Sequence, residues 1–153
     1  MFNIVLVAPE IPQNTGTIGR LCVCNGAPLH LIRPLGFSLD ETQLRRAGLD
    51  YWPYLDLHVH DDWEAFLAAA APDQERLFFI STKAQASIFK TDLRDGDWLV
   101  FGRETSGLPP EFYDRYRNQL RLIPMLGEHC RSLNLANAVS IVFYEALRQT
   151  GQV

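Results

Sequence analysis

The stretch Asn3-Ile-Val-Leu-Val-Ala8 decides the fold class of this chain, because its apolar residues are consecutive. A strand with one solvated face alternates apolar and polar residues, whereas a strand of a parallel sheet with helices on both faces is apolar throughout. Pro9 and Pro12 follow at once and end the run. The stretch therefore predicts a buried first strand in an α/β sheet.

Outward from this strand, short apolar runs alternate with amphipathic stretches, which is typical of a mostly parallel sheet flanked by helices. The expected strands cover residues 3–8, 29–32, 55–59, 76–81, 98–101 and 119–123. The expected helices cover residues 14–25, 38–46, 63–71, 109–117 and 132–149. A length of 153 residues with 47% hydrophobic residues fits a single domain over residues 1–153.

Capping side chains predict where three of these helices begin. Asn14 or Thr15 is expected to cap the first helix, and Ser132 the last. Ser38-Leu-Asp-Glu41 fits a capping box for a short helix through Arg45 and Arg46. The first helix should end at Asn25-Gly26, because glycine tolerates the positive φ of a helix stop.

The closing helix carries two apolar stripes. One stripe consists of Leu133, Ala136, Ser140, Phe143 and Leu147, and the other of Leu135, Val139, Val142 and Ala146. One stripe should pack on the sheet, and in a domain this small the second should be exposed. A homodimer interface is the natural cover for it, while the alternative is a helix inserted wholly within one core.

Charge and cysteine content limit the function classes. With 14 Lys and Arg against 18 Asp and Glu, the formal charge of −4 excludes a nucleic-acid partner held by bulk charge, so any such contact must be a local patch. No basic leader and no run of about 20 apolar residues is present, so we expect no membrane partner. Three cysteines without metal-ligand spacing predict a reduced, cytoplasmic protein with no metal.

Three segments rich in glycine, small polar residues and arginine follow predicted strands. They cover residues 12–20, 101–109 and 123–137, and the carboxyl ends of strands are where open α/β sheets bind ligands. In the first segment Gly16 and Gly19 would let a helix start approach a phosphate or sugar, and Arg20 adds a forked donor. Each feature also has a purely structural interpretation, in capping, tight packing or a surface cation.

The other two segments add backbone and amide groups. Gly102 after a strand exposes backbone N–H and C=O groups, which suits recognition of an adenine edge, and Glu104 could orient an arginine or accept from a hydroxyl. Ser132 and Asn134 place polar groups at the start of the most hydrophobic helix. Burying such groups unpaired would cost about 1–3 kcal/mol each, so they are expected to have partners.

In this order, the three segments resemble the three motifs of the SPOUT superfamily of RNA methyltransferases. The matching stretches are Asn14-Thr-Gly-x-x-x-Arg20, Phe101-Gly-x-Glu-x-x-Gly-Leu-Pro109, and Ile123-Pro-Met with Ser132-Leu-Asn-Leu-Ala-Asn-Ala-Val-Ser140. Together with Arg45-Arg-Ala-Gly-Leu-Asp-Tyr51, they make the chain similar to the small tRNA 2′-O-methyltransferases that act on the cytidine or uridine of the wobble position.

The resemblance implies a C-terminal trefoil knot, S-adenosylmethionine as cofactor, the tRNA anticodon loop as substrate, and a homodimer whose partner helps complete the site. By position it assigns cofactor binding to Ile80, Gly102, Ile123 and Ser132, with Met125 and Leu133 beside them. It assigns substrate binding to Asn14, Glu104 and Asn134, and catalysis to Arg20.

Arg20 matches the residue to which the family assigns activation of the ribose hydroxyl. A guanidinium with a pKa above about 12 is a poor base at neutral pH, so we expect it to stabilise charge on the ribose oxygen, with Asn14 and Glu104 fixing its fork. Two alternatives stay open: 2′-O-methylation of another RNA such as ribosomal RNA, and a non-catalytic RNA-binding assembly factor.

Overall fold

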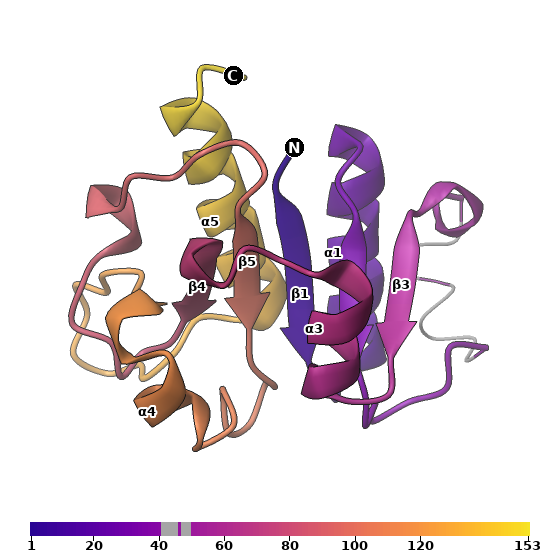
Figure 1. Ribbon diagram of the computed structural model, residues 1–153, viewed down its shortest axis with the longest axis horizontal. Helices are drawn as coiled ribbons and strands as arrows, with labels where there is room; N and C mark the ends of the chain where they lie inside the picture. The colour runs from indigo at the N-terminus through magenta and orange to yellow at the C-terminus, as the bar shows by residue number, and fades with distance from the viewer. Residues whose placement is uncertain (41–45, 47–49) are drawn as a thin grey trace.

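A parallel sheet forms the centre of the molecule (Figure 1). The computed structural model describes residues 1–40, 46 and 50–153, and in this part of the chain six strands pair in the order β3-β2-β1-β5-β4-β6, all parallel. The strands are β1 Asn3–Val7, β2 Leu29–Ile32, β3 Leu57–His60, β4 Leu77–Ile80, β5 Trp98–Phe101 and β6 Leu120–Arg121. The predicted α/β class is confirmed.

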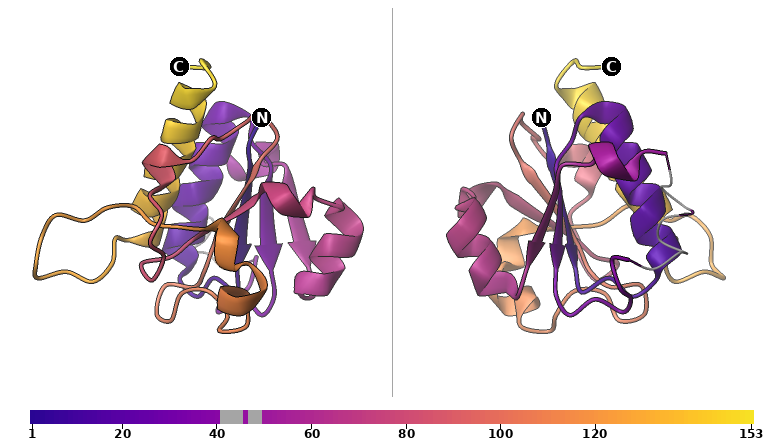
Figure 2. Two further views of the ribbon diagram at one scale, coloured as in Figure 1. Left: turned by 60° about the vertical axis from the view of Figure 1, so that its left-hand side comes forward. Right: turned by 90° about the vertical axis from the view of Figure 1, so that its right-hand side faces the viewer.

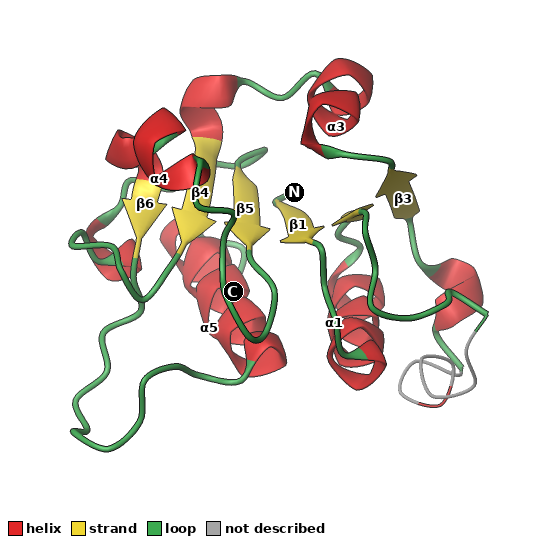
Figure 3. Cartoon of the chain, turned by 90° about the horizontal axis from the view of Figure 1, so that it is seen from below, coloured by secondary structure: helices red, strands yellow, loops and turns green. Residues whose placement is uncertain are grey.

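Helices cover both faces of this sheet. They are α1 Pro12–Asn25, α3 Trp63–Ala70, α4 Phe112–Arg115 and α5 Leu135–Gln149, with the 3-10 helices η1 Trp52–Tyr54, η2 Gln74–Arg76, η3 Ile88–Lys90 and η4 Arg117–Gln119. Helices α1 and α5 lie on one face and α3 and α4 on the other (Figures 2 and 3). None of the helices in the described ranges is long and apolar enough to cross a membrane.

The burial of β1 explains its continuous apolar run. Ile4 and Leu6 belong to the core between the sheet and helices α1 and α5. Val5 and Val7 belong to the core beneath α3 and α4. Since successive side chains of a strand point to opposite faces, a strand buried on both faces needs apolar residues at every position.

Four strands differ from their predicted bounds, and β3 and β6 are the two that differ by more than one residue at an end. β3 begins at Leu57 rather than residue 55, because Leu55 N–H donates to the Trp52 carbonyl in the preceding turn. β6 covers only Leu120–Arg121, and Leu122 continues the pairing as a parallel bridge to Ser87. Both are the outer strands of the sheet. Because each pairs with a neighbour on one side only, the adjoining turns determine where the strand begins and ends.

The predicted cap of the first helix is wrong. α1 begins at Pro12, which suits the first turn because it lacks the N–H that would be unpaired there. Ile11 occupies the N-cap without a side-chain bond, while Asn14 and Thr15 lie inside the first turn and are buried. The predicted stop is confirmed, since Gly26 has a φ of 65°.

The predicted start of the last helix is also wrong. α5 begins at Leu135, because the Asn134 side-chain oxygen accepts from the Asn137 N–H at 3.2 Å and acts as the cap. Ser132 lies in the loop before it. Ser140 Oγ donates to the Ala136 carbonyl at 2.9 Å, so this half-buried hydroxyl is satisfied within the helix.

Both apolar stripes of α5 are largely buried within the chain, so the expected exposure of the second stripe is wrong. Val139, Val142 and Ala146 are fully buried, because α5 packs against α1 as well as the sheet. The apolar side chains of α5 that are exposed lie elsewhere: Ile141 at 37% and Tyr144 at 45%.

Three predictions stay predictions, one about a helix and two about the chain as a whole. Most of the helix expected over residues 38–46, including Arg45, lies outside the described residues. The trefoil knot and the single domain over residues 1–153 also stay predictions. The loop that connects β6 to α5 extends to one side of the molecule (Figure 2).

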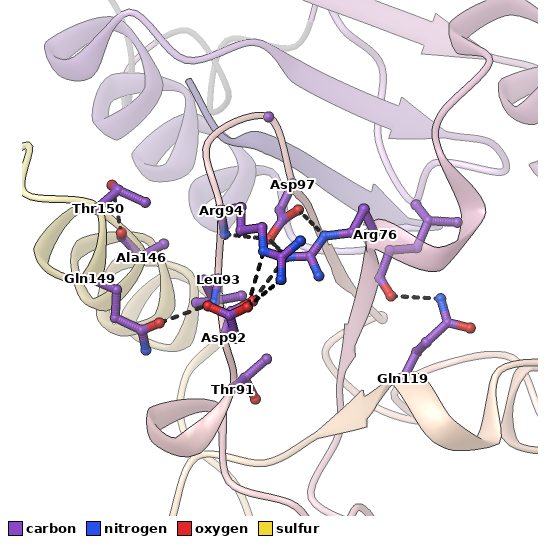
Figure 4. A network of polar contacts seen from close by, with 12 residues as sticks. Arg76, Thr91, Asp92, Leu93, Arg94, Asp97, Gln119, Ala146, Gln149 and Thr150 are labelled. Carbon is purple, nitrogen blue, oxygen red and sulfur yellow. Dashed lines mark hydrogen bonds and ion pairs between the residues drawn. The ribbon is translucent and has the colours of Figure 1, made fainter.

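At the amino-terminal ends of the strands, an ion pair joins the partly buried Arg76 to the buried Asp97 (Figure 4). Arg76 donates to both carboxylate oxygens of Asp97, at 2.7 and 2.6 Å, and the Arg94 N–H donates to the same carboxylate at 2.7 Å. Arg76 also donates to the Asp92 carbonyl at 2.9 Å. These bonds fix the turn before β5 to the start of β4.

Candidate functional site

A cavity of about 660 Å³ lies at the carboxyl edge of the sheet, the edge that faces the viewer in Figure 3. Its walls come from the ends of β4 and β5, the start of α1, and the loop that leads into α5. Seven of the eight predicted site residues line it: Asn14, Ile80, Gly102, Glu104, Ile123, Ser132 and Asn134. The three sequence segments therefore meet around one space, as the sequence predicts.

Gly102 is required by a close approach of two backbone segments. A Cβ atom at this position would lie 2.1 Å from the Gly107 carbonyl carbon and 2.3 Å from the Leu108 nitrogen. Arg103 and Gly107 exchange backbone hydrogen bonds of 3.1 and 3.0 Å, and Gly107 turns the chain with a φ of 73°. The loop thus folds back onto Gly102 and presents backbone atoms to the cavity.

Glu104 connects this loop to the start of α1. Its carboxylate accepts from the Glu10 N–H at 2.7 Å and from the Ile11 N–H at 3.3 Å. In return, Thr105 Oγ1 donates to the Glu10 carboxylate at 2.7 Å. A carboxylate is stabilised at the positive end of a helix dipole, so Glu104 takes the capping role that Ile11 cannot supply.

Asn14 and Asn134 connect the first segment to the third. Asn134 Nδ2 donates to Asn14 Oδ1 at 3.1 Å, and Asn134 Oδ1 caps α5. The starts of α1 and α5 are thereby fixed to each other at the cavity wall. Thr15 Oγ1, one residue further along, is buried without a hydrogen-bond partner among the described residues.

Arg20 lies apart from the other predicted site residues and lines neither this cavity nor the second one described below. It is six residues beyond Asn14, about 9 Å along the helix axis. Its guanidinium lies 4.8 Å from the centre of the Tyr51 ring and has no polar partner in the part of the chain that the structure describes. The expected fixing of its fork by Asn14 and Glu104 is wrong for this chain alone, because those side chains bond Asn134 and backbone amides.

The sequence interpretation missed two cavity residues, Lys83 and Tyr113. Ser81 Oγ and Tyr113 OH are 2.8 Å apart, and Lys83 Nζ lies 5.2 Å from the Tyr113 ring centre. The polar run Ser81-Thr-Lys83 after a predicted strand was an available signal for Lys83. Tyr113 had none, since it reaches the cavity only through the packing of α4.

No group of three or more metal-binding side chains occurs among residues 1–40, 46 and 50–153. Cys22 is buried, which raises the pKa of its thiol to about 12 and makes it a core residue. Cys24 and Cys130 are exposed.

The cavity fits S-adenosylmethionine in its shape and chemistry. Because Gly102 has no side chain, the loop after β5 folds back onto it and brings the backbone of Gly102 and Gly107 to the cavity wall. Ile80, Ile123 and Leu133 give this wall an apolar surface. A cavity of this volume, apolar with a few convergent polar groups, is typical of sites for cofactors of this size.

A parallel sheet with a glycine-backed cavity at its carboxyl edge defines an α/β protein that binds a nucleotide-like cofactor. The chain matches the model of the SpoU rRNA Methylase family over residues 1–144. It therefore belongs to this family.

Similar proteins cover nearly the whole chain. A tRNA (cytidine(34)-2′-O)-methyltransferase of Burkholderia cenocepacia is 53% identical over 99% of this chain and 97% of its own length. The enzyme of the same name from Escherichia coli is 49% identical over 99% of this chain and 95% of its own length.

Solved structures agree with these relatives. One, described as giving structural insights into the 2-OH methylation of C/U34 on tRNA, matches with a TM-score of 0.90 at 49% identity, covering 97% of this chain and 95% of that one. An AdoMet-bound rRNA methyltransferase from Sinorhizobium meliloti matches with a TM-score of 0.82 at 26% identity, covering 96% of this chain and 56% of that one.

Proposed function

We propose that this protein is an S-adenosylmethionine-dependent methyltransferase that methylates the ribose 2′-hydroxyl of nucleotide 34, a cytidine or modified uridine, in the tRNA anticodon loop. The observation that carries the proposal is the meeting of Asn14, Gly102, Glu104 and Asn134 around one cavity. Relatives of 49–53% identity with this named activity support it. The chain acts as one domain in the cytoplasm, together with its tRNA substrate.

When bound, S-adenosylmethionine supplies an electrophilic methyl group. The residues of this chain then have to hold the ribose 2′-oxygen in line with the methyl group and prevent other orientations of the ribose. The Asn14–Asn134 pair and the Glu104 contacts fix the helix starts and loop that form the wall. Arg20 stays charged at neutral pH and stabilises the negative charge that develops on the ribose oxygen.

The position of Arg20 favours a homodimer with a shared site. Arg20 is exposed on α1 and does not line the cavity of its own chain. On α5, Ile141 and Tyr144 are exposed, and Tyr144 OH donates to Asn25 of α1 at 3.4 Å. This α1–α5 face packs against a second copy, and Arg20 of one subunit reaches the ribose held at the cavity of the other.

Methyl transfer from labelled S-adenosylmethionine to RNA from a strain lacking the protein tests the proposed function. We expect label in tRNA, located by nuclease digestion at the 2′-oxygen of nucleotide 34. Label in ribosomal RNA alone would show that ribosomal RNA, and not tRNA, is the substrate. No transfer to either RNA, despite cofactor binding, would favour the assembly factor.

Arg20→Ala tests the assigned charge stabilisation. We expect kcat to fall by about 10²–10³-fold, because removing one hydrogen-bond donor to a developing oxyanion typically lowers kcat by this factor. Cofactor binding should be retained. Arg94→Ala is the control, since Arg94 is exposed and pairs with Asp92 at the opposite edge of the sheet. A loss of tenfold or less with intact RNA binding would contradict the role.

A further inference from the structure

A second cavity, of about 540 Å³, opens beside the first. It lies between the ends of β1 and β2, the start of α3 and the start of α4. Both cavities are lined by Lys83, Arg103, Ser106, Gly107 and Tyr113, which we call the shared wall. A ligand with a continuous backbone can therefore cross the shared wall and occupy both cavities at once.

The lining of the second cavity is positively charged in a chain of net charge −4. Arg33, Lys83 and Arg103 line it together with one acidic residue, Glu111, and Arg103 also pairs with Glu10 at 3.6 Å, outside the lining. Lys83 has no carboxylate partner among the described residues, and its ammonium group lies over the Tyr113 ring. Arg33 pairs with the exposed Asp61 at 3.3 Å, a surface pair that water and salt weaken and that a phosphate can replace.

Much of the lining of the second cavity is apolar, and the rings of Trp63 and Phe112 belong to the core and are 8% and 2% exposed. Trp63 and Phe112 lie there with ring centres 4.7 Å apart, and Trp63 Nε1 donates to Tyr116 OH at 2.8 Å. Pro34 and Pro109 add flat, inflexible surface. Single-stranded RNA loops are recognised by this combination, in which splayed bases contact aromatic or apolar surface and cations hold the phosphates.

We propose that the second cavity binds a nucleotide adjacent to the methylated one on the same RNA strand. Its base contacts the apolar surface around Trp63, and its phosphate lies at Lys83 on the shared wall. Arg33 contacts the next phosphate of the RNA backbone. This inference rests on the proposed function, because it assumes that the methylated ribose is held at the first cavity.

Binding of an anticodon stem–loop RNA, followed by fluorescence anisotropy over a range of salt concentrations, tests the charges. Lys83→Gln and Arg33→Gln should each weaken binding by about fivefold and lower the salt slope by about 1, because each removes one phosphate contact. Glu111→Gln should strengthen binding, because it removes a repulsive charge. S-adenosylmethionine affinity should not change in Arg33→Gln or Glu111→Gln, since neither residue lines the first cavity.

Two matched controls come from the same chain. Lys90→Gln removes the only other lysine, which is exposed in η3 and lines neither cavity. Glu75→Gln removes an exposed carboxylate in η2, away from both cavities. Both variants should bind the stem–loop as the wild type does.

Photocrosslinking locates the flanking nucleotide. With 4-thiouridine at position 33 or 35 of the stem–loop, we expect adducts in peptides that contain Trp63 or residues 108–113. Crosslinks elsewhere, or unchanged affinities of Lys83→Gln and Arg33→Gln in an enzyme that methylates tRNA, would overturn the second-cavity assignment alone. A wild-type protein that transfers no methyl group to tRNA would instead overturn the proposed function.

Discussion

Gly102 is the residue at which the backbone of the site leaves no space for a side chain. We predict that Gly102→Ala reduces the affinity for S-adenosylmethionine by at least tenfold and lowers the free energy of unfolding by about 1–3 kcal/mol, because the added methyl group must displace backbone of Gly107 and Leu108. Isothermal titration calorimetry and urea denaturation measure the two effects.

Gly127→Ala is the matched control for this substitution. A Cβ atom at Gly127 would meet nothing within 4 Å, so neither quantity should change. If Gly102→Ala bound the cofactor as the wild type does, the loop after β5 would not form the cofactor wall.

Most of the residues that line the cavity could be predicted from the sequence, but their hydrogen-bond partners could not. Asn14, Glu104 and Asn134 stand in motifs that the sequence displays. Their contacts depend on the fold, since Glu104 bonds the backbone of Glu10, which is 94 residues away. For the same reason the local capping rules fail at α1, where the cap comes from a distant carboxylate.

At the scale of elements, the two edges of the sheet have different roles. The carboxyl ends of the strands border the cavities, whereas the amino ends carry the ion pair of Arg76 and Asp97. The Asp97 side chain of this pair is 3% exposed. The hydrogen bond to Asp97 raises the pKa of Arg76, so the guanidinium stays charged. Removing Asp97 leaves this partly buried guanidinium without its acceptor.

We predict that Asp97→Ala lowers the free energy of unfolding by about 1–3 kcal/mol, because Arg76 and the Arg94 N–H lose their acceptor. Activity at a temperature where the variant is folded should be retained, since the cavity lies at the other edge. Urea denaturation and a methyl-transfer assay test this, with Asp92→Ala as an exposed control. Equal stability of the two variants would contradict it.

The pairing of β2 with β3 creates a pH dependence. His30 Nδ1 and His60 Nε2 are 3.0 Å apart, and His58 stacks on His30 with ring centres 4.5 Å apart. Burial, reinforced by the charges of His58 and His60, lowers the pKa of His30 to about 4, and burial also lowers the pKa of His60. Near pH 7 the fold therefore holds both rings neutral.

Stability should fall as the pH falls below about 6.5, because the unfolded chain then binds protons that the fold excludes. The loss from His30 alone reaches about 3 kcal/mol near pH 4, and none is expected above pH 7. Urea denaturation between pH 7 and pH 4.5 measures how the free energy of unfolding changes with pH. This slope should be smaller in His30→Gln than in the wild type, and unchanged in the control His129→Gln, whose histidine is exposed. Equal slopes in all three proteins would contradict this origin.

The strands were predictable from the sequence because their apolar runs are local signals, as in β1 and β5. The burial of α5 was not, because it depends on α1 lying beside it. A helix covered by the sheet alone would expose its second stripe, whereas contact with α1 buries Val142 and Ala146 as well.

At the scale of the whole molecule, the proposed dimer makes a prediction about mixed subunits. Arg20→Ala retains an intact cavity, and Gly102→Ala retains an intact Arg20. At a cofactor concentration that leaves Gly102→Ala largely unbound, random reassortment of equal amounts of the two should restore about a quarter of wild-type activity if Arg20 acts on the cavity of the partner, since half the dimers then hold one complete site.

Assays of each variant alone and of the mixture after reassociation measure this recovery. Mixing either variant with itself is the control and should restore nothing. No recovery from confirmed mixed dimers would place Arg20 and the cavity of one subunit in the same site.

Two tRNA substrates, one with a 2′-deoxyribose at nucleotide 34 and one with a 2′-deoxyribose at nucleotide 32, test whether the ribose of nucleotide 34 accepts the methyl group. We expect methyl transfer to be lost with deoxyribose at 34 and retained with deoxyribose at 32, because only the first lacks the acceptor oxygen. Transfer to the tRNA with deoxyribose at nucleotide 34 would contradict this expectation.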